Sequence, residues 1–238
     1  MVAQGLRRAV LHGLVCASPV QRRSRDRGGY ARALLDLPLY RREWHLDIEA
    51  DPSRGPLVYL HGVWERSGAP GNWEERFVPF LADRPDAERQ AFADVWAFLN
   101  SDPESVVYYY SPYERTSYRM LQRRYPDVCT AEDVDAFFAS DRVVDLYTDV
   151  VAPLTEWPLP SYGLKAIAKS RGFAWNAVDA GGASSIAWFD EWCRTGDRSV
   201  LDRIVDYNRS DVMASAVVLD ALRALPVNPP PGLYSSGG

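Results

Sequence analysis

Hydrophobic and polar positions alternate with a period of two where the chain first shows a regular pattern. Residues 44–49 place apolar side chains at every second position, which predicts a half-buried strand. Residues 57–64 and about 73–81 predict two further strands, and residues 51–56 between the first two are rich in Pro, Ser and Gly, as turns are. Because these connections are short, we expect an antiparallel meander of three strands.

Helical periodicity then begins to alternate with short strands. We predict a helix over residues 86–100, a strand over 106–110, a helix from Pro112 with Tyr118, Leu121 and Tyr125 inside, a short helix over 131–138 and a last strand over 142–146. Three more helices are expected over residues 161–170, opened by a capping residue and ended by Gly172, over 184–194 and over about 200–224. This order indicates an α/β domain with a mixed five-stranded sheet, three strands antiparallel and two parallel, flanked by helices.

The two ends of the chain differ from this patterned region, which we place at residues 41–226. Residues 1–40 form a basic leader with arginines at 7, 8, 22, 23, 25 and 27, and we expect it to be disordered or the remnant of an upstream domain. Its short apolar stretch resembles a targeting peptide only weakly. Residues 227–238 are rich in Pro, Ser and Gly, so we expect a flexible tail.

Composition narrows the functional classes. With 47% hydrophobic and 25% charged residues the chain resembles an ordinary globular domain, and no apolar run approaches the roughly 20 residues that a membrane span needs. Cys16, Cys129 and Cys193 are too few and too scattered for a disulfide framework or a zinc site, which favours the reducing cytoplasm. The net charge of -5 argues against a protein that coats nucleic acid by bulk electrostatics, but not against a nuclease.

Two pairs of polar residues are candidates for chemistry. Asp47 and Glu49 lie two apart on a predicted strand, so both side chains point to one face and could chelate a hard divalent cation together. Tyr207 and Asp211 lie four apart on the predicted long helix and share a face. Each pair also has a plain structural interpretation, because Asp-x-Glu is a common pattern and a Tyr one turn before an Asp is often a surface hydrogen-bonding pair.

A third candidate lies where the fourth predicted strand turns into a helix, at the sheet edge where α/β proteins bind ligands. Glu114 would be a further metal ligand there, and Tyr110 and Tyr113 could stack on a base or sugar. The alternative is a solvated Glu in a first helical turn, where the helix dipole favours it. If the first predicted strand, this strand-to-helix turn and the long helix pack in one domain, their polar side chains would meet at one site. Such a site would suit in-line phosphoryl transfer with two metal ions.

These residues resemble a known family. Asp47-x-Glu49, Glu114 and Tyr207-x-x-x-Asp211 are similar to the three motifs of the DEDD exonuclease superfamily, in the subgroup with Tyr in its third motif. Six ordered blocks resemble more closely the ribonuclease H-like domain of the YprB type found in RecB-like nucleases: residues 44–52, 110–116, 144–147, 161–168, 181–188 and 206–211. The resemblance covers residues 43–225.

The resemblance implies a ribonuclease H-like fold and a 3′-to-5′ exonuclease that hydrolyses single-stranded DNA or RNA. It implies that two Mg²⁺ or Mn²⁺ ions are held by Asp47, Glu49, Glu114 and Asp211, with Asp47 bridging, while Tyr207 positions the attacking water. Residues expected along the substrate path are Tyr110, Arg115 and Lys165. A RecB-like nuclease or helicase is the expected partner.

The sequence differs from the family pattern at three positions and lacks an expected upstream portion, and these differences leave other functions open. Glu114 stands where the superfamily has Asp, Tyr109 where this family usually has His, and Ser210 where an acid is usual. The RecB-like portion expected upstream is missing from the roughly forty residues before Glu43, which favours an inactive nucleic-acid-binding or assembly module separated from a larger nuclease. Another phosphoesterase with the same metals is a third alternative. We expect Asp145 to serve as a structural cap and Trp175 and Trp188 to serve in packing.

Overall fold

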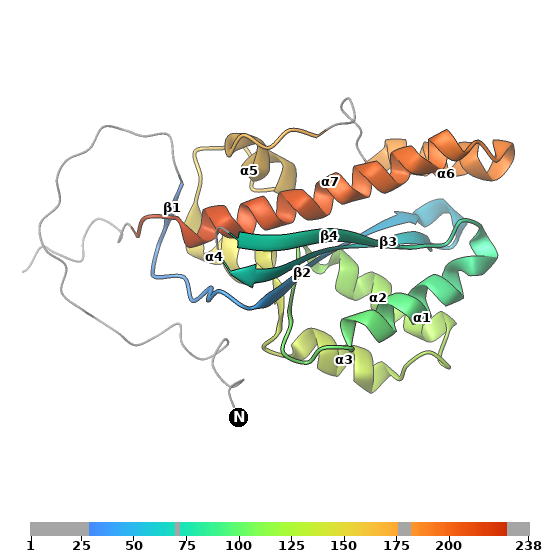
Figure 1. Ribbon diagram of the computed structural model, residues 1–238, viewed down its shortest axis with the longest axis horizontal. Coiled ribbons are helices and arrows are strands. Elements are labelled where there is room, and N and C mark those ends of the chain that lie inside the picture. The colour runs from blue at the N-terminus through green and yellow to red at the C-terminus, as the bar shows by residue number, and fades with distance from the viewer. Residues whose placement is uncertain (1–28, 70–71, 176–181, 228–238) are drawn as a thin grey trace, which may run out of the picture.

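A computed structural model of the chain describes residues 29–69, 72–175 and 182–227 (Figure 1). Our expectations for residues 1–28 and 228–238, which include Cys16 and most of the leader and tail, lie outside these ranges. Within the described ranges, no helix combines the length and the apolar character that a membrane crossing requires.

The central sheet has five strands in the order β4-β3-β2-β5-β6. Three of them, β2 (Arg42–Asp51), β3 (Leu57–Ala69) and β4 (Asn72–Leu81), form the antiparallel meander. Of the other two, β5 (Val106–Tyr109) pairs in parallel with β2, and β6 (Val143–Asp145) pairs in parallel with β5. This confirms the predicted α/β fold class, with three antiparallel strands followed by two parallel ones.

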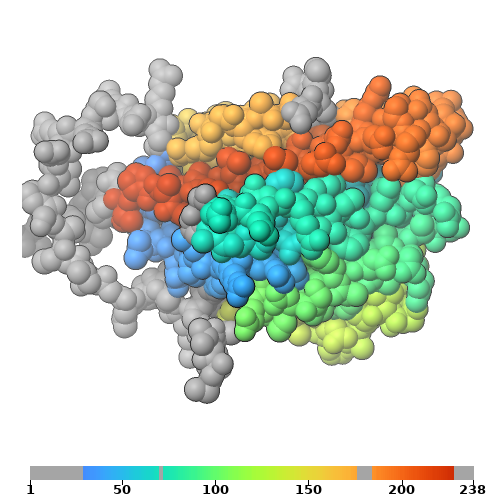
Figure 2. Space-filling model, in the orientation of Figure 1, coloured from blue at the N-terminus to red at the C-terminus, as the bar shows by residue number. Residues whose placement is uncertain are grey.

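Helices cover both faces of the sheet (Figure 1). One face carries α1 (Glu88–Leu99), α2 (Pro112–Arg124) and α3 (Ala131–Ala139), and the other carries α5 (Leu164–Ser170), α6 (Gly182–Thr195) and the long α7 (Arg198–Arg223). In the space-filling view, these two groups lie on opposite sides of the hairpin formed by β3 and β4 (Figure 2). The order β2, β3, β4, α1, β5, α2, α3, β6 and then helices agrees with the order expected from periodicity.

The alternation along β2 divides its side chains between the two layers. Trp44, Leu46 and Ile48 are buried in the cluster that includes α1, α2 and α3. The intervening positions, His45, Asp47 and Glu49, therefore face the layer of α7, because successive strand residues point to opposite faces. The carboxylates of Asp47 and Glu49 are thus directed at the long helix.

The structure also corrects and extends the predicted elements. Helix α5 begins at Leu164, three residues later than expected, and Gly163 precedes it without a side-chain cap, so the expected capping residue is wrong. Gly172, which follows the helix, has a φ of 86°, which glycine adopts without strain. Sequence periodicity missed the short elements η2 (Pro52–Arg54), η3 (Pro85–Ala87), the π-helical turn η4 (Leu146–Val151), α4 (Ala152–Leu154) and the two-stranded sheet of β1 (Tyr30–Ala31) and β7 (Thr155–Glu156). Such elements are too short to show a period.

The described part of the leader packs against the domain. The Ala31 amide donates to the Pro226 carbonyl at 3.0 Å, and Leu37 is buried in the cluster that includes α7. Arg223 near the end of α7 donates to the carbonyls of Leu37 and Pro38. Residues 29–40 are therefore held by backbone pairing and by burial of apolar side chains.

Candidate active site

Three carboxylates from two distant parts of the sequence meet between β2 and α7. Asp47, Glu49 and Asp211 each offer an oxygen, and these oxygens lie within 4.8 Å of one another. Glu49 and Asp211 are buried and Asp47 is partly exposed. The strand and helix pairs that the sequence singled out separately are therefore brought together.

Burial raises the pKa of each carboxyl group, and repulsion from neighbouring carboxylates adds to this effect for Asp47 and Glu49. For Asp47 the pKa rises well above its usual range, first because of burial and then because of the charges of Asp211, Glu49 and Glu114. Burial is also the main reason that the pKa of Glu49 rises to about 8 and that the pKa of Asp211 rises. A cluster that disfavours its own ionisation is the environment in which a bound cation is favourable, since a hard divalent ion prefers oxygen ligands.

Glu114 reaches the same region from the first turn of α2. It is 3% exposed, burial raises its pKa to about 8, and its charge raises the pKa of Asp47. The strand-to-helix turn before it is strained, because Ser111 has a φ of 140°, which side chains disfavour. The Ser111 hydroxyl donates to Glu114 at 3.3 Å and also accepts a hydrogen bond from the Tyr113 amide. The turn thus holds Glu114 beside the cluster.

Tyr207 and Lys165 add a hydrogen-bonded chain to the cluster. The Lys165 ammonium donates to the Tyr207 hydroxyl at 2.8 Å and lies 4.6 Å from the centre of that ring. The Tyr207 hydroxyl in turn bonds to Asp211, and the positive charge of Lys165 lowers the pKa values of Glu49 and Asp211. Lys165 therefore contacts the candidate site through Tyr207.

Several groups that hold the carboxylates were missed by sequence reasoning. Trp175 Nε1 donates to Asp211 Oδ1 at 2.5 Å, so packing alone does not account for this residue. Asn208 Nδ2 donates to Asp47 Oδ2 at 2.8 Å. Ser185 hydrogen-bonds to Glu49, and its hydroxyl lies 2.7 Å from the Tyr59 hydroxyl. One sequence signal was the position of Asn208 directly after Tyr207 on a predicted helix.

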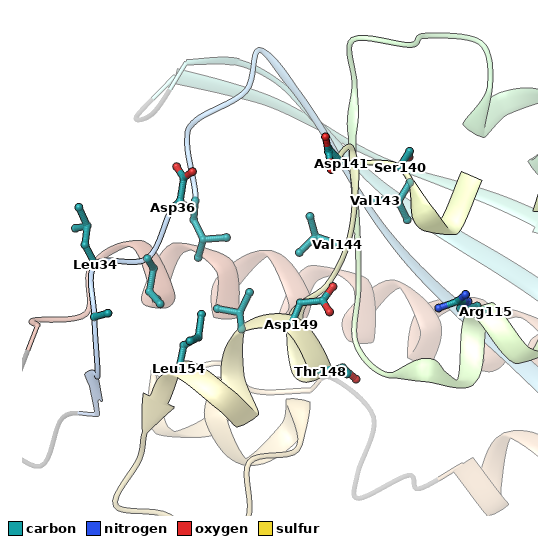
Figure 3. Close-up of a pocket in the computed structure, with 14 residues that line it drawn as sticks. Leu34, Asp36, Arg115, Ser140, Asp141, Val143, Val144, Thr148, Asp149 and Leu154 are labelled. Atoms are coloured by element: carbon teal, nitrogen blue, oxygen red, sulfur yellow. The ribbon is translucent and has the colours of Figure 1, made fainter. Parts of the chain in front are cut away.

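The aromatic and basic residues that we expected along the substrate path do not all lie at one place in the structure. Tyr110 is half-buried and donates to the Tyr162 carbonyl at 2.6 Å, whereas Tyr113 is 47% exposed. Arg115 lines a cavity of about 550 Å³ between residues 33–37, β6 and η4 (Figure 3). None of the residues that line this cavity belongs to the carboxylate cluster. Arg115 is thus on the cavity side of α2.

The remaining polar residues that the sequence raised have structural contacts. Asp145 accepts hydrogen bonds from the amides of Tyr147 and Thr148, each at 3.0 Å, so it caps η4. His45 Nδ1 lies 3.0 Å from the Ser215 hydroxyl, one turn beyond Asp211 on α7. Trp188 packs edge-on against the Tyr207 ring.

Comparison with known families identifies this arrangement. The family model RNase_H_2, described as RNase_H superfamily, matches residues 44–223, from β2 to the end of α7. The chain belongs to the RNase_H_2 family. Searches among curated proteins and among solved structures found no match. Membership in the RNase_H superfamily indicates a nucleic-acid hydrolase, and the acidic triad agrees with the divalent metals that RNase H-like nucleases usually use.

Proposed function

We propose that this RNase_H_2 protein is a metal-dependent 3′-to-5′ exonuclease of the DEDD type with Tyr in its third motif, acting on single-stranded DNA or RNA. The observation that carries the proposal is the approach of Asp47, Glu49 and Asp211 oxygens to within 4.8 Å in a largely buried setting. The same residues are those of the motifs noted in the sequence, and the RNase_H_2 match supports the nuclease class.

The donor set fits a hard divalent metal. All the candidate ligand atoms are carboxylate oxygens, which Mg²⁺ and Mn²⁺ prefer, and no histidine or cysteine lies in the described cluster. Asp47, Glu49, Glu114 and Asp211 would hold two ions. When bound, such ions supply a more acidic water and stabilise charge on the leaving oxygen of a phosphodiester.

The chain's own groups have separate tasks in this proposal. Tyr207 presents a hydroxyl that is already oriented by Lys165 and Asp211, so it can position the attacking water. Lys165 places a positive charge beside the carboxylates, where it would attract the scissile phosphate as well as orient Tyr207. Trp175 and Asn208 fix the carboxylates by hydrogen bonds. The exposed ring of Tyr113 near the cluster is available for stacking on a terminal base.

Degradation of labelled single-stranded DNA and RNA by the purified full chain tests this function. With a 5′ label and Mg²⁺ or Mn²⁺, we expect a ladder of products shortened from the 3′ end, lost on addition of EDTA and in the Asp47→Asn/Asp211→Asn variant. Products of endonucleolytic size, or release of label from the 5′ end, would contradict the exonuclease proposal. Binding of nucleic acid without turnover under either metal would support the inactive module instead.

A further inference from the structure

Asn208 is a buried amide that joins the two layers of the candidate site. It follows Tyr207 on α7 and has no exposed surface. Its Nδ2 donates to Asp47 Oδ2 at 2.8 Å, and a hydrogen bond from the same side chain lowers the pKa of Glu49. One side chain of the helix layer therefore bonds to Asp47 and lies close enough to Glu49 to affect its pKa.

The space that Asn208 occupies depends on a glycine in the neighbouring strand. Gly62 in β3 is the register partner of Asp47. A Cβ at position 62 would overlap Asn208 Oδ1 and would lie 2.9 Å from Phe77 Cε2. Gly62 does not have a positive φ, so its backbone conformation does not require glycine. What requires glycine is the close approach of the Asn208 carboxamide to the strand.

The other end of the carboxamide gains no hydrogen bond. Asn208 Oδ1 is buried and has no hydrogen-bond partner among the described residues. Burying an acceptor without a partner is unfavourable, so packing is a poor explanation for an asparagine at this position. The contact that favours asparagine is the hydrogen bond from its Nδ2 to Asp47 Oδ2.

We propose that Asn208, packed against Gly62, is a positioning residue that fixes the orientation of Asp47 for metal binding. The inference rests on the proposed metal-dependent function. By donating to Asp47 Oδ2, the amide selects one rotation of that carboxylate and leaves its other oxygen for a metal. Hydrogen bonds of this kind around ligands commonly change metal affinity by about 10- to 100-fold.

The test is Mn²⁺ binding by calorimetry, together with hydrolysis rates over a range of Mn²⁺ concentrations. Asn208→Leu keeps the branched shape of the side chain and removes the donor, so we expect its Mn²⁺ affinity to fall by about tenfold or more. Saturating Mn²⁺ should restore most of the rate. Ser210→Ala is the matched control, because this buried hydroxyl on the same helix bonds to the Asp206 carbonyl, and its affinity should equal that of the wild type.

The Gly62→Ala variant is an independent test, because it substitutes neither Asn208 nor any of the carboxylates. The added methyl group must displace the carboxamide, so this variant should also bind Mn²⁺ more weakly. In an Asn208→Ala background the overlap with the carboxamide is gone and only the Phe77 ring must shift slightly, so Gly62→Ala should then cause little further loss of affinity. This non-additivity would show that the glycine acts through Asn208.

Thermal unfolding of the metal-free proteins shows whether each variant is folded. If folded Asn208→Leu and Gly62→Ala proteins bind Mn²⁺ as tightly as the wild type, the positioning role is wrong. If Asn208→Leu does not fold, Gly62→Ala and its cycle with Asn208→Ala decide the question. If the wild type itself takes up no Mn²⁺, the metal site is wrong, and the inference is overturned with it.

Discussion

Replacing Glu49 by Gln should stabilise the metal-free protein at alkaline pH while it removes a metal ligand. Glu49 is 6% exposed, and burial raises its pKa from 4.5 to about 8. Because the folded state holds the proton more tightly than the unfolded chain, folding is favoured at low pH. This contribution is fully present below about pH 4.5 and is lost as the pH rises towards 8.

The size of the effect follows from that pKa shift. Each pKa unit corresponds to about 1.4 kcal/mol, so an ionised Glu49 costs the folded state on the order of 5 kcal/mol relative to the unfolded chain. Gln carries no charge at any pH. We therefore expect the free energy of unfolding of Glu49→Gln to exceed that of the wild type by about 2 kcal/mol or more near pH 9, and by little near pH 5.

The assay is urea unfolding of both proteins in EDTA across this pH range, followed by far-UV circular dichroism. Glu104→Gln is the control, because Glu104 is exposed in a turn away from the cluster and its replacement should leave the pH dependence unchanged. Added Mg²⁺ should stabilise the wild type at alkaline pH more than Glu49→Gln. Equal stabilities of the two proteins throughout the range would refute the argument that burial makes ionisation of Glu49 unfavourable in the metal-free protein.

Two further substitutions separate catalysis from folding. Lys165→Met removes the donor to the Tyr207 hydroxyl and the cation beside Glu49 and Asp211, so kcat should fall about tenfold or more with little change in the unfolding midpoint. The control is Lys169→Met, one turn later, which should keep most of the rate in the same nuclease assay. Equal losses of rate in both variants would contradict the role of Lys165. Arg223→Met leaves fully buried Glu43 without its 2.6 Å partner, and we expect a loss of about 3 kcal/mol in urea unfolding. Arg198→Met, which breaks an exposed pair with Asp202, should cost less than about 1 kcal/mol, and a similar loss in both variants would show that burial of Glu43 is not the cause.

Periodicity predicted the parts of the fold in which one face of an element is buried. The period of two along β2 predicted a strand, and because it put Asp47 and Glu49 on one face it also predicted that they act together. The spacing of Tyr207 and Asp211 did the same for α7. In both cases local geometry decides which side chains share a face, so the sequence alone was sufficient.

The contacts that tune the cluster depend on the packing between elements. The hydrogen bond from Asn208 to Asp47 joins residues 161 positions apart in the sequence. The packing of the Asn208 side chain against Gly62 depends on the register between β3 and β2. A glycine inside a predicted strand was a usable sign of close approach, but it did not indicate which residue approaches. The bond from Trp175 to Asp211 joins the loop that follows α5 to α7, and this packing has no signature in either segment.

Anomalous diffraction from crystals of the full chain soaked in Mn²⁺ tests the central claim most directly. We predict anomalous peaks from Mn²⁺ ions that are coordinated by the oxygens of Asp47, Glu49 and Asp211, with Glu114 as a further ligand. These peaks should be absent from Asp47→Asn crystals. Well-ordered carboxylates with no anomalous peak between them at saturating Mn²⁺, or ions bound only elsewhere on the chain, would contradict the account.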